Sequence, residues 1–124
     1  IFLIGEIGVG KTTFTRYLIN RLQEKNGEKI TEVLSPTFNL LYEYDLKTIK
    51  IMHYDLYRIK DEKELKHLGI FLDKKDTIKI IEWPQLINIS LPDKLEIHLD
   101  YIKNEKEREI KFRGTDRWKF LNEL

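Results

Sequence analysis

The chain has 124 residues and no cysteine, and its 22 Lys and Arg residues against 21 Asp and Glu give a net charge of +1. This length suits one domain with a real core. The missing cysteines exclude disulfides, zinc–thiolate sites and thiol catalysis, and the near-neutral charge argues against a nucleic-acid binder that works mainly by electrostatics. No signal peptide and no run of 18 apolar residues is present, which predicts a cytoplasmic protein without a membrane contact.

The first feature along the chain is a glycine-rich stretch. Residues 5–12 read GEIGVGKT, a complete G-x-x-x-x-G-K-T phosphate-binding loop that directly follows an apolar run. Glycines let successive backbone N–H groups turn toward phosphate oxygens, and the following helix adds the positive end of its dipole. The Lys11 ammonium can follow the β- and γ-phosphates, and the Thr12 hydroxyl is placed to ligate Mg²⁺. The sequence therefore predicts a nucleoside triphosphate site built by Gly5, Gly8, Val9, Gly10, Lys11, Thr12 and Thr13.

Helices and strands follow the loop in a mixed order. Apolar residues at helical spacing predict the first helix, and alternating patterns around polar turns predict two hairpins. Asp61 is the expected N-cap of a short second helix, Pro84 ends a strongly apolar strand, and Asn104 with Glu105 forms the second hairpin's turn. The predicted helices cover residues 10–25 and 61–67 and start again near 115; the predicted strands cover residues 30–34, 39–44, 49–54, 77–83, 95–102 and 107–113.

This order predicts an α/β fold, a P-loop NTPase-like three-layer sandwich. A strand that feeds a phosphate loop and a helix implies a right-handed βαβ unit, so the centre of the sheet should be parallel, whereas the hairpins add antiparallel strands. Nothing in the pattern divides residues 1–124, which we interpret as a single domain. Because Ile1 already lies inside the expected central strand, we also expect a segment that precedes it.

Two acidic residues stand at predicted strand ends. Asp55 follows one strand, and Glu82 closes the apolar run at residues 78–81, as the acid of a Walker-B segment does. Both can reach the sheet edge where the phosphate loop lies, which makes Glu82 a second candidate magnesium ligand beside Thr12. From position alone, Asp55 remains as often an ordinary strand-end acid as a functional one.

Three further residues are ambiguous from sequence alone. Thr37 belongs to the segment Ser-Pro-Thr-Phe at residues 35–38, which is either a plain turn or a loop whose hydroxyl reaches a γ-phosphate. His53 alone is as often structural as catalytic. Trp83 is either core packing or a stacking surface.

Taken together and in this order, four motifs resemble a known family. GEIGVGKTTF at residues 5–14, SPTF at 35–38, HYDLYR at 53–58 and EWP at 82–84 are similar to the motifs of the bacterial tRNA threonylcarbamoyladenosine biosynthesis ATPase, the TsaE (YjeE) family. The likeness spans nearly the whole chain.

The resemblance implies a Mg²⁺-dependent ATPase that works with TsaB and TsaD proteins to form threonylcarbamoyladenosine beside the anticodon of tRNA. It implies that Lys11 and Thr12 keep their loop roles and that Thr37 lies in a switch-like segment. It also implies that Asp55 is the acid of an H-x-D-x-Y-R motif and that Glu82 helps to hold Mg²⁺. Contact with tRNA is expected to be indirect. Family members carry a segment before the phosphate-loop strand that contributes to adenine contacts, and here the hairpin at residues 95–113 could supply one wall of that pocket.

Rival functions share the phosphate loop. A small-molecule kinase would add an arginine-bearing lid and an acceptor pocket; no such lid is evident in the sequence, and Arg58 is the best candidate for a charge near the site, or a partner for a neighbouring carboxylate. A GTP-type switch would carry an N/T-K-x-D tetrad, whereas the string DKKD at residues 73–76 precedes its strand, so we interpret it as a polar turn. An interaction module would keep its role after Lys11→Ala. Since no arginine finger is obvious, we expect slow hydrolysis that partner proteins accelerate.

Overall fold

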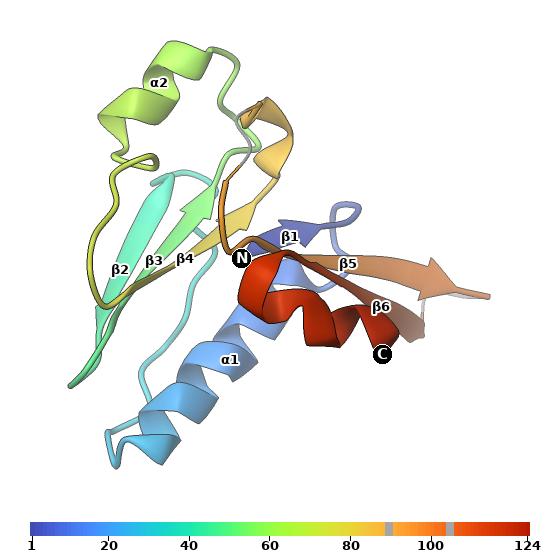
Figure 1. The fold of residues 1–124 in the computed structure, drawn as a ribbon, viewed down its shortest axis with the longest axis horizontal. Helices are drawn as coiled ribbons and strands as arrows, with labels where there is room; N and C mark the ends of the chain where they lie inside the picture. Colours follow the sequence, from blue (N-terminus) through green and yellow to red (C-terminus); the bar gives the residue numbers. More distant parts are fainter. Residues whose placement is uncertain (89–90, 104–105) are drawn as a thin grey trace.

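A six-stranded sheet with helices on both faces forms the protein (Figure 1). The structure is a computed structural model, which describes residues 1–88, 91–103 and 106–124. The elements in chain order are β1 (Phe2–Ile4), α1 (Lys11–Lys25), β2 (Leu41–Asp45), β3 (Lys50–Asp55), α2 (Glu62–His67), β4 (Thr77–Glu82), the short 3₁₀ helix η1 (Pro84–Leu86), β5 (Leu95–Ile102), β6 (Glu107–Gly114) and the 3₁₀ helix η2 (Asp116–Glu123).

The sheet has a parallel centre and antiparallel edges. Its strand order is β2-β3-β4-β1-β5-β6, so β1 lies between strands that come much later in the sequence. Strands β3, β4, β1 and β5 run parallel, whereas β2 pairs antiparallel with β3, and β6 pairs antiparallel with β5. This arrangement confirms the mixed sheet predicted from sequence. It also brings the carboxyl ends of β1, β3 and β4 to the same edge.

Two apolar clusters cover the two faces of the sheet, because side chains alternate along each strand. Leu3 and Ile80 belong to the cluster under α1 and η2, to which Phe14 and Trp118 also contribute. The residues next to Leu3 in β1 and next to Ile80 in β4 face the opposite way, into a second cluster that includes Leu65 of α2. The three layers predicted from sequence are therefore present.

The helix boundaries follow local chemistry. Helix α2 begins where the Asp61 carboxylate accepts the N–H of Lys63 at 2.9 Å, as the N-cap prediction required. After α2, Gly69 adopts φ +68°, the left-handed conformation that favours glycine after a helix. None of the helices in the described ranges is long and apolar enough to cross a membrane.

Three predictions about the elements need comment. The prediction of a strand over residues 30–34 is wrong, because this segment has no strand pairing. Only Val33 is buried there, whereas Ile30 and Leu34 are exposed. The last helix is present but is a 3₁₀ helix, held against β6 by hydrogen bonds between the Asn122 side chain and the Gly114 backbone. The turn assigned to Asn104 and Glu105 lies outside the described residues.

Candidate nucleotide site

The loop between β1 and α1 has the glycine geometry that a phosphate cradle needs. Gly8 and Gly10 adopt φ of +79° and +114°, which side chains with a Cβ rarely tolerate. Gly5 meets a different constraint, because a Cβ there would lie 2.6 Å from the Leu99 carbonyl oxygen. Two glycines therefore turn the loop, and the third allows it to leave the sheet close to β5.

The N-terminus of α1 is open toward this loop. Its N-cap is Gly10, which offers no side chain to occupy the first backbone N–H groups, and its first turn carries no acidic residue. A helix start of this kind presents unpaired donors and partial positive charge. The end of α1 is thus suited to bind an anion.

Lys11 is folded into the loop and almost buried, with 5% of its surface exposed. Its Nζ donates to the carbonyl oxygens of Gly5 at 2.6 Å and Glu6 at 2.8 Å, and lies 4.1 Å from the centre of the Trp83 ring. Burial lowers the pKa of Lys11, although the nearby Glu82 and Asp55 carboxylates act in the opposite direction. This desolvated ammonium is positioned to exchange loop carbonyls for phosphate oxygens.

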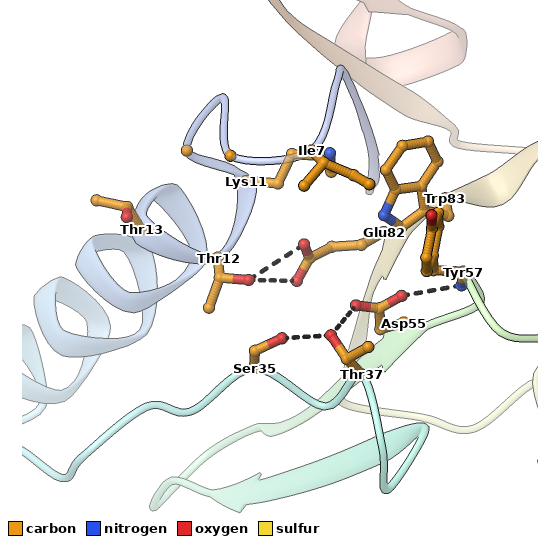
Figure 2. Close-up of a pocket in the computed structure, with 12 residues that line it drawn as sticks. Ile7, Lys11, Thr12, Thr13, Ser35, Thr37, Asp55, Tyr57, Glu82 and Trp83 are labelled. Atoms are coloured by element: carbon orange, nitrogen blue, oxygen red, sulfur yellow. Dashed lines mark hydrogen bonds between the residues drawn. The ribbon is translucent and has the colours of Figure 1, made fainter.

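Glu82 lies opposite the start of α1. It ends β4 with 3% exposure and pairs in register with Leu3 of β1. The Thr12 hydroxyl donates to its two carboxylate oxygens at 3.1 and 3.2 Å (Figure 2). On the other side, His53 Nε2 lies 2.6 Å from Glu82 Oε2. The predicted pair of magnesium ligands is therefore already adjacent.

Asp55 and Thr37 form a second set of contacts beside the first. The Thr37 hydroxyl donates to Asp55 Oδ2 at 2.9 Å and lies 2.8 Å from the Ser35 hydroxyl (Figure 2). The other oxygen of Asp55 accepts the backbone N–H of Tyr57 at 2.9 Å. Sequence alone left residues 35–38 open as either a plain turn or a switch-like loop. In the structure, the Thr37 hydroxyl of this segment contacts Asp55, the acid at the end of β3.

These groups surround one cleft of about 320 Å³. Its walls are Ile7, Gly8, Gly10, Lys11, Thr12, Thr13, Ser35, Thr37, Asp55, Tyr57, Glu82 and Trp83. Two residues that the sequence assigned to nucleotide binding do not line it. Gly5 packs against β5, and Val9 has its side chain in the core while its N–H donates to Glu6 at 3.2 Å. Any role of these two in binding stays a prediction.

The donor set of the cleft fits a magnesium ion that arrives with a nucleotide. Thr12 offers a hydroxyl, and Glu82 and Asp55 offer carboxylates, which are the hard oxygen ligands that Mg²⁺ prefers. Across the described ranges, no group of three or more His, Asp and Glu side chains could hold a metal. The oxygens of Thr12, Glu82 and Asp55 suit Mg²⁺, which usually takes one or two carboxylates and completes its shell with phosphate oxygens and water.

Sequence reasoning missed several contacts around the cleft. Trp83, left open between packing and stacking, does contact the Lys11 ammonium, and its ring centre lies 4.9 Å from that of Tyr57. Arg108 of β6 donates from Nε to the Val9 carbonyl oxygen at 2.8 Å. No local pattern could have indicated a contact across 99 residues of sequence. The guanidinium of Arg58, the sequence's candidate for a charge near the site, lies 5.1 Å from the centre of the exposed Phe38 ring.

The fold and this cleft define a P-loop NTPase-like α/β protein. A sequence model of the family described as "Threonylcarbamoyl adenosine biosynthesis protein TsaE" matches residues 1–110. A relative named tRNA threonylcarbamoyladenosine biosynthesis protein TsaE, from Rickettsia typhi, is 37% identical over 107 residues, which cover 86% of this chain and 72% of the relative. The protein of the same name from Bacillus subtilis is 34% identical over 124 residues, covering 98% of this chain and 73% of its own length. The chain belongs to the TsaE family.

A comparison with solved structures supports the same fold. The crystal structure of Bacillus subtilis YdiB superimposes with a TM-score of 0.65 at 30% identity, covering 98% of this chain and 72% of that one. Relatives extend beyond this chain, which spans from 57% to 73% of their length in the Aquifex aeolicus and Bacillus subtilis proteins.

Proposed function

We propose that this chain binds ATP with Mg²⁺ and hydrolyses it, and that hydrolysis serves the biosynthesis of threonylcarbamoyladenosine in tRNA, the role of the family. The observation that carries the proposal is the convergence of Lys11, Thr12, Asp55 and Glu82 on one cleft at the open end of α1. A triphosphatase needs these classes of group: a cradle of N–H donors, a mobile cation, metal-holding oxygens and a carboxylate near the γ-phosphate.

Each residue has a distinct task in this proposal. The backbone of the loop and Lys11 bind the β- and γ-phosphates, and Thr12 with Glu82 hold Mg²⁺, which neutralises developing charge on the phosphate oxygens. Asp55 accepts from Thr37 on one oxygen and from the backbone at Tyr57 on the other. This arrangement couples the acid to the loop at residues 35–38, so loss of the γ-phosphate can change the position of both.

The rival functions receive less support. The DKKD string at residues 73–76 precedes Thr77, which pairs with Lys50 at the opposite end of the β3–β4 pair from Asp55 and Glu82. A guanine-reading tetrad would have to lie near the phosphate loop instead. A kinase would need an arginine-bearing lid, and Arg58, the candidate for a charge near the site, is exposed and does not line the cleft.

Partner proteins of the TsaB and TsaD type complete the proposal. The chain's net charge of +1 gives little drive for a direct tRNA contact, so recognition of tRNA falls to the partners. We propose slow hydrolysis by the chain alone and acceleration in the complex, where a partner adds order or positive charge to the site. The site of action is the cytoplasm, where tRNA is modified.

The test measures ATP hydrolysis by the purified chain, alone and with the TsaB–TsaD pair, alongside formation of the modified nucleoside on tRNA. Activity that depends on Mg²⁺, rises with the partners and disappears in Lys11→Ala supports the proposal. Lys25→Ala, at the far end of α1, is the matched control and should behave as wild type. Equal rates with and without the partners would defeat the activation step, and hydrolysis that survives Lys11→Ala would defeat the site.

A further inference from the structure

His53 lies beneath the candidate magnesium ligand, on the buried side of the cleft. It occupies β3 opposite Ile80 of β4, two residues before the pair formed by Asp55 and Glu82. Alternation along β3 places His53 on the same face of the sheet as Asp55, and that face is covered by α1. The imidazole is completely buried, with 0% exposure, and it does not line the cleft.

The contact between His53 and Glu82 is short and one-sided. His53 Nε2 lies 2.6 Å from Glu82 Oε2, and the Thr12 hydroxyl donates to both carboxylate oxygens, to Oε2 at 3.1 Å and to Oε1 at 3.2 Å. An ionised carboxylate only accepts hydrogen bonds, so we assign the hydrogen to Nε2. The imidazole therefore restrains the carboxylate from the core side, while Thr12 contacts it from the start of α1.

The other ring nitrogen of His53 takes no part in this contact. His53 Nδ1 is buried and has no hydrogen-bond partner among the residues that the structure describes. Burying an unpaired acceptor costs stability, and an apolar residue at the same place in β3 would avoid that cost. Only the contact with Glu82 makes use of histidine chemistry at this position.

We propose that His53 is a positioning residue for magnesium, which fixes the Glu82 carboxylate so that Thr12 and Glu82 meet the ion together. Residues that hydrogen-bond to a metal ligand orient it, and their loss typically weakens metal binding by about 10- to 100-fold. The inference rests on the proposed function, since it requires that Mg²⁺ binds with the nucleotide at this cleft. It assigns a role in magnesium binding to a residue that does not line the cleft.

The experiment titrates Mg²⁺ into the complex of the full chain with ADP, with binding followed by calorimetry, and compares four histidine variants. His53→Phe removes the donor and should weaken the apparent Mg²⁺ affinity by about 10- to 100-fold. ADP affinity in EDTA should stay unchanged. His53→Gln carries an N–H at the position of Nε2 and should recover most of the affinity, whereas His53→Asn places its amide at the position of Nδ1 and should not. His67→Phe, the same change at an exposed position of α2 outside the cleft, is the control.

The outcomes separate the inference from the function beneath it. If wild type binds ADP without any response to Mg²⁺, the proposed magnesium site fails and the role of His53 fails with it. If wild type responds to Mg²⁺ and His53→Phe responds equally, only the role of His53 is overturned. Thermal unfolding without ligand shows whether each variant is folded. Should His53→Phe not fold, Gln and Asn decide: equal Mg²⁺ affinities in these two would overturn the inference.

Discussion

The Thr12 hydroxyl donates to the Glu82 carboxylate, although 70 residues separate them in sequence. The contact exists because β4 pairs directly with β1, so the end of β4 faces the helix start that follows β1. Two oxygen ligands suited to Mg²⁺ are thus preset in the folded chain.

Replacing Glu82 by Ala should lower ATP turnover by about 10²- to 10³-fold, the usual effect of removing one charge-stabilising group from such a site. ADP binding should partly survive, because the loop backbone and Lys11 remain. Steady-state hydrolysis and calorimetry measure the two effects separately. Glu64→Ala, which removes an exposed carboxylate from α2, is the control and should hydrolyse ATP as wild type does. Unchanged turnover in Glu82→Ala would remove this residue from the mechanism.

Thr37→Val should separate ATP from ADP. The substitution keeps the shape of the side chain but removes the hydroxyl that donates to Asp55. If this segment senses the γ-phosphate, the affinity for a non-hydrolysable ATP analogue and the turnover should fall, while the affinity for ADP stays the same. Thr77→Val, at the far end of β4, serves as the control. Equal losses for both nucleotides would show that Thr37 only maintains the loop.

Gly5→Ala should destabilise the fold and weaken nucleotide binding together. A Cβ at this position would lie 2.6 Å from the Leu99 carbonyl oxygen and 2.7 Å from Val9 Cγ1, so the loop must shift. We expect a loss of about 1 to 3 kcal/mol in the free energy of unfolding, as for other overpacked sites. Gly27→Ala is the comparison: its φ is +67° with no atom within 4 Å, so it should cost stability without a change in ADP affinity.

Stability in alkali should depend on Tyr54. Burial, with a smaller contribution from Glu43, raises the pKa of the Tyr54 hydroxyl to about 12, against about 10 in an unfolded chain. Between these values the folded protein keeps a proton that the unfolded chain has lost, so stability falls as the pH rises from about 10 to about 12. The two pKa units correspond to about 3 kcal/mol.

The check is urea unfolding of wild type and Tyr54→Phe at pH 9 and near pH 12. Tyr54→Phe loses the hydrogen bond to the Leu68 carbonyl, 3.1 Å long, so it should start about 1 kcal/mol less stable. Wild type should then lose more stability than the variant as the pH rises. The exposed Tyr17→Phe should follow wild type. Parallel loss in Tyr54→Phe would contradict the raised pKa.

Much of this fold could be predicted from local sequence signals. The phosphate loop, the two hairpins and the capping residue Asp61 each depend on neighbours a few residues away, and the structure confirms the strand pairing of the hairpins and the Asp61 cap. The strand expected over residues 30–34 failed because alternation alone does not provide a partner strand. That segment places one side chain, Val33, on the core instead.

The candidate site was partly predictable for the same reason. Strand-end acids at Asp55 and Glu82 follow from apolar runs, and parallel strands bring their ends to one edge. The contact of His53 with Glu82 depends on the pairing of β3 with β4, and the contact of Arg108 with the Val9 carbonyl depends on the strand order β1-β5-β6. The alternation of side chains along β3 already places His53 on the same face as Asp55. This signal predicts the contact with Glu82 only once β4 is known to lie beside β3.

The most direct test of the central claim is a crystal structure of the chain with Mg²⁺ and a non-hydrolysable ATP analogue. We predict that the β- and γ-phosphates contact Lys11 and the backbone N–H groups of the loop. Mg²⁺ should lie about 2.0 to 2.1 Å from the Thr12 hydroxyl oxygen, the usual distance for this ion, with Glu82 directly or through water in its shell. Phosphates bound elsewhere, or a cleft that stays empty at saturating analogue, would contradict the account.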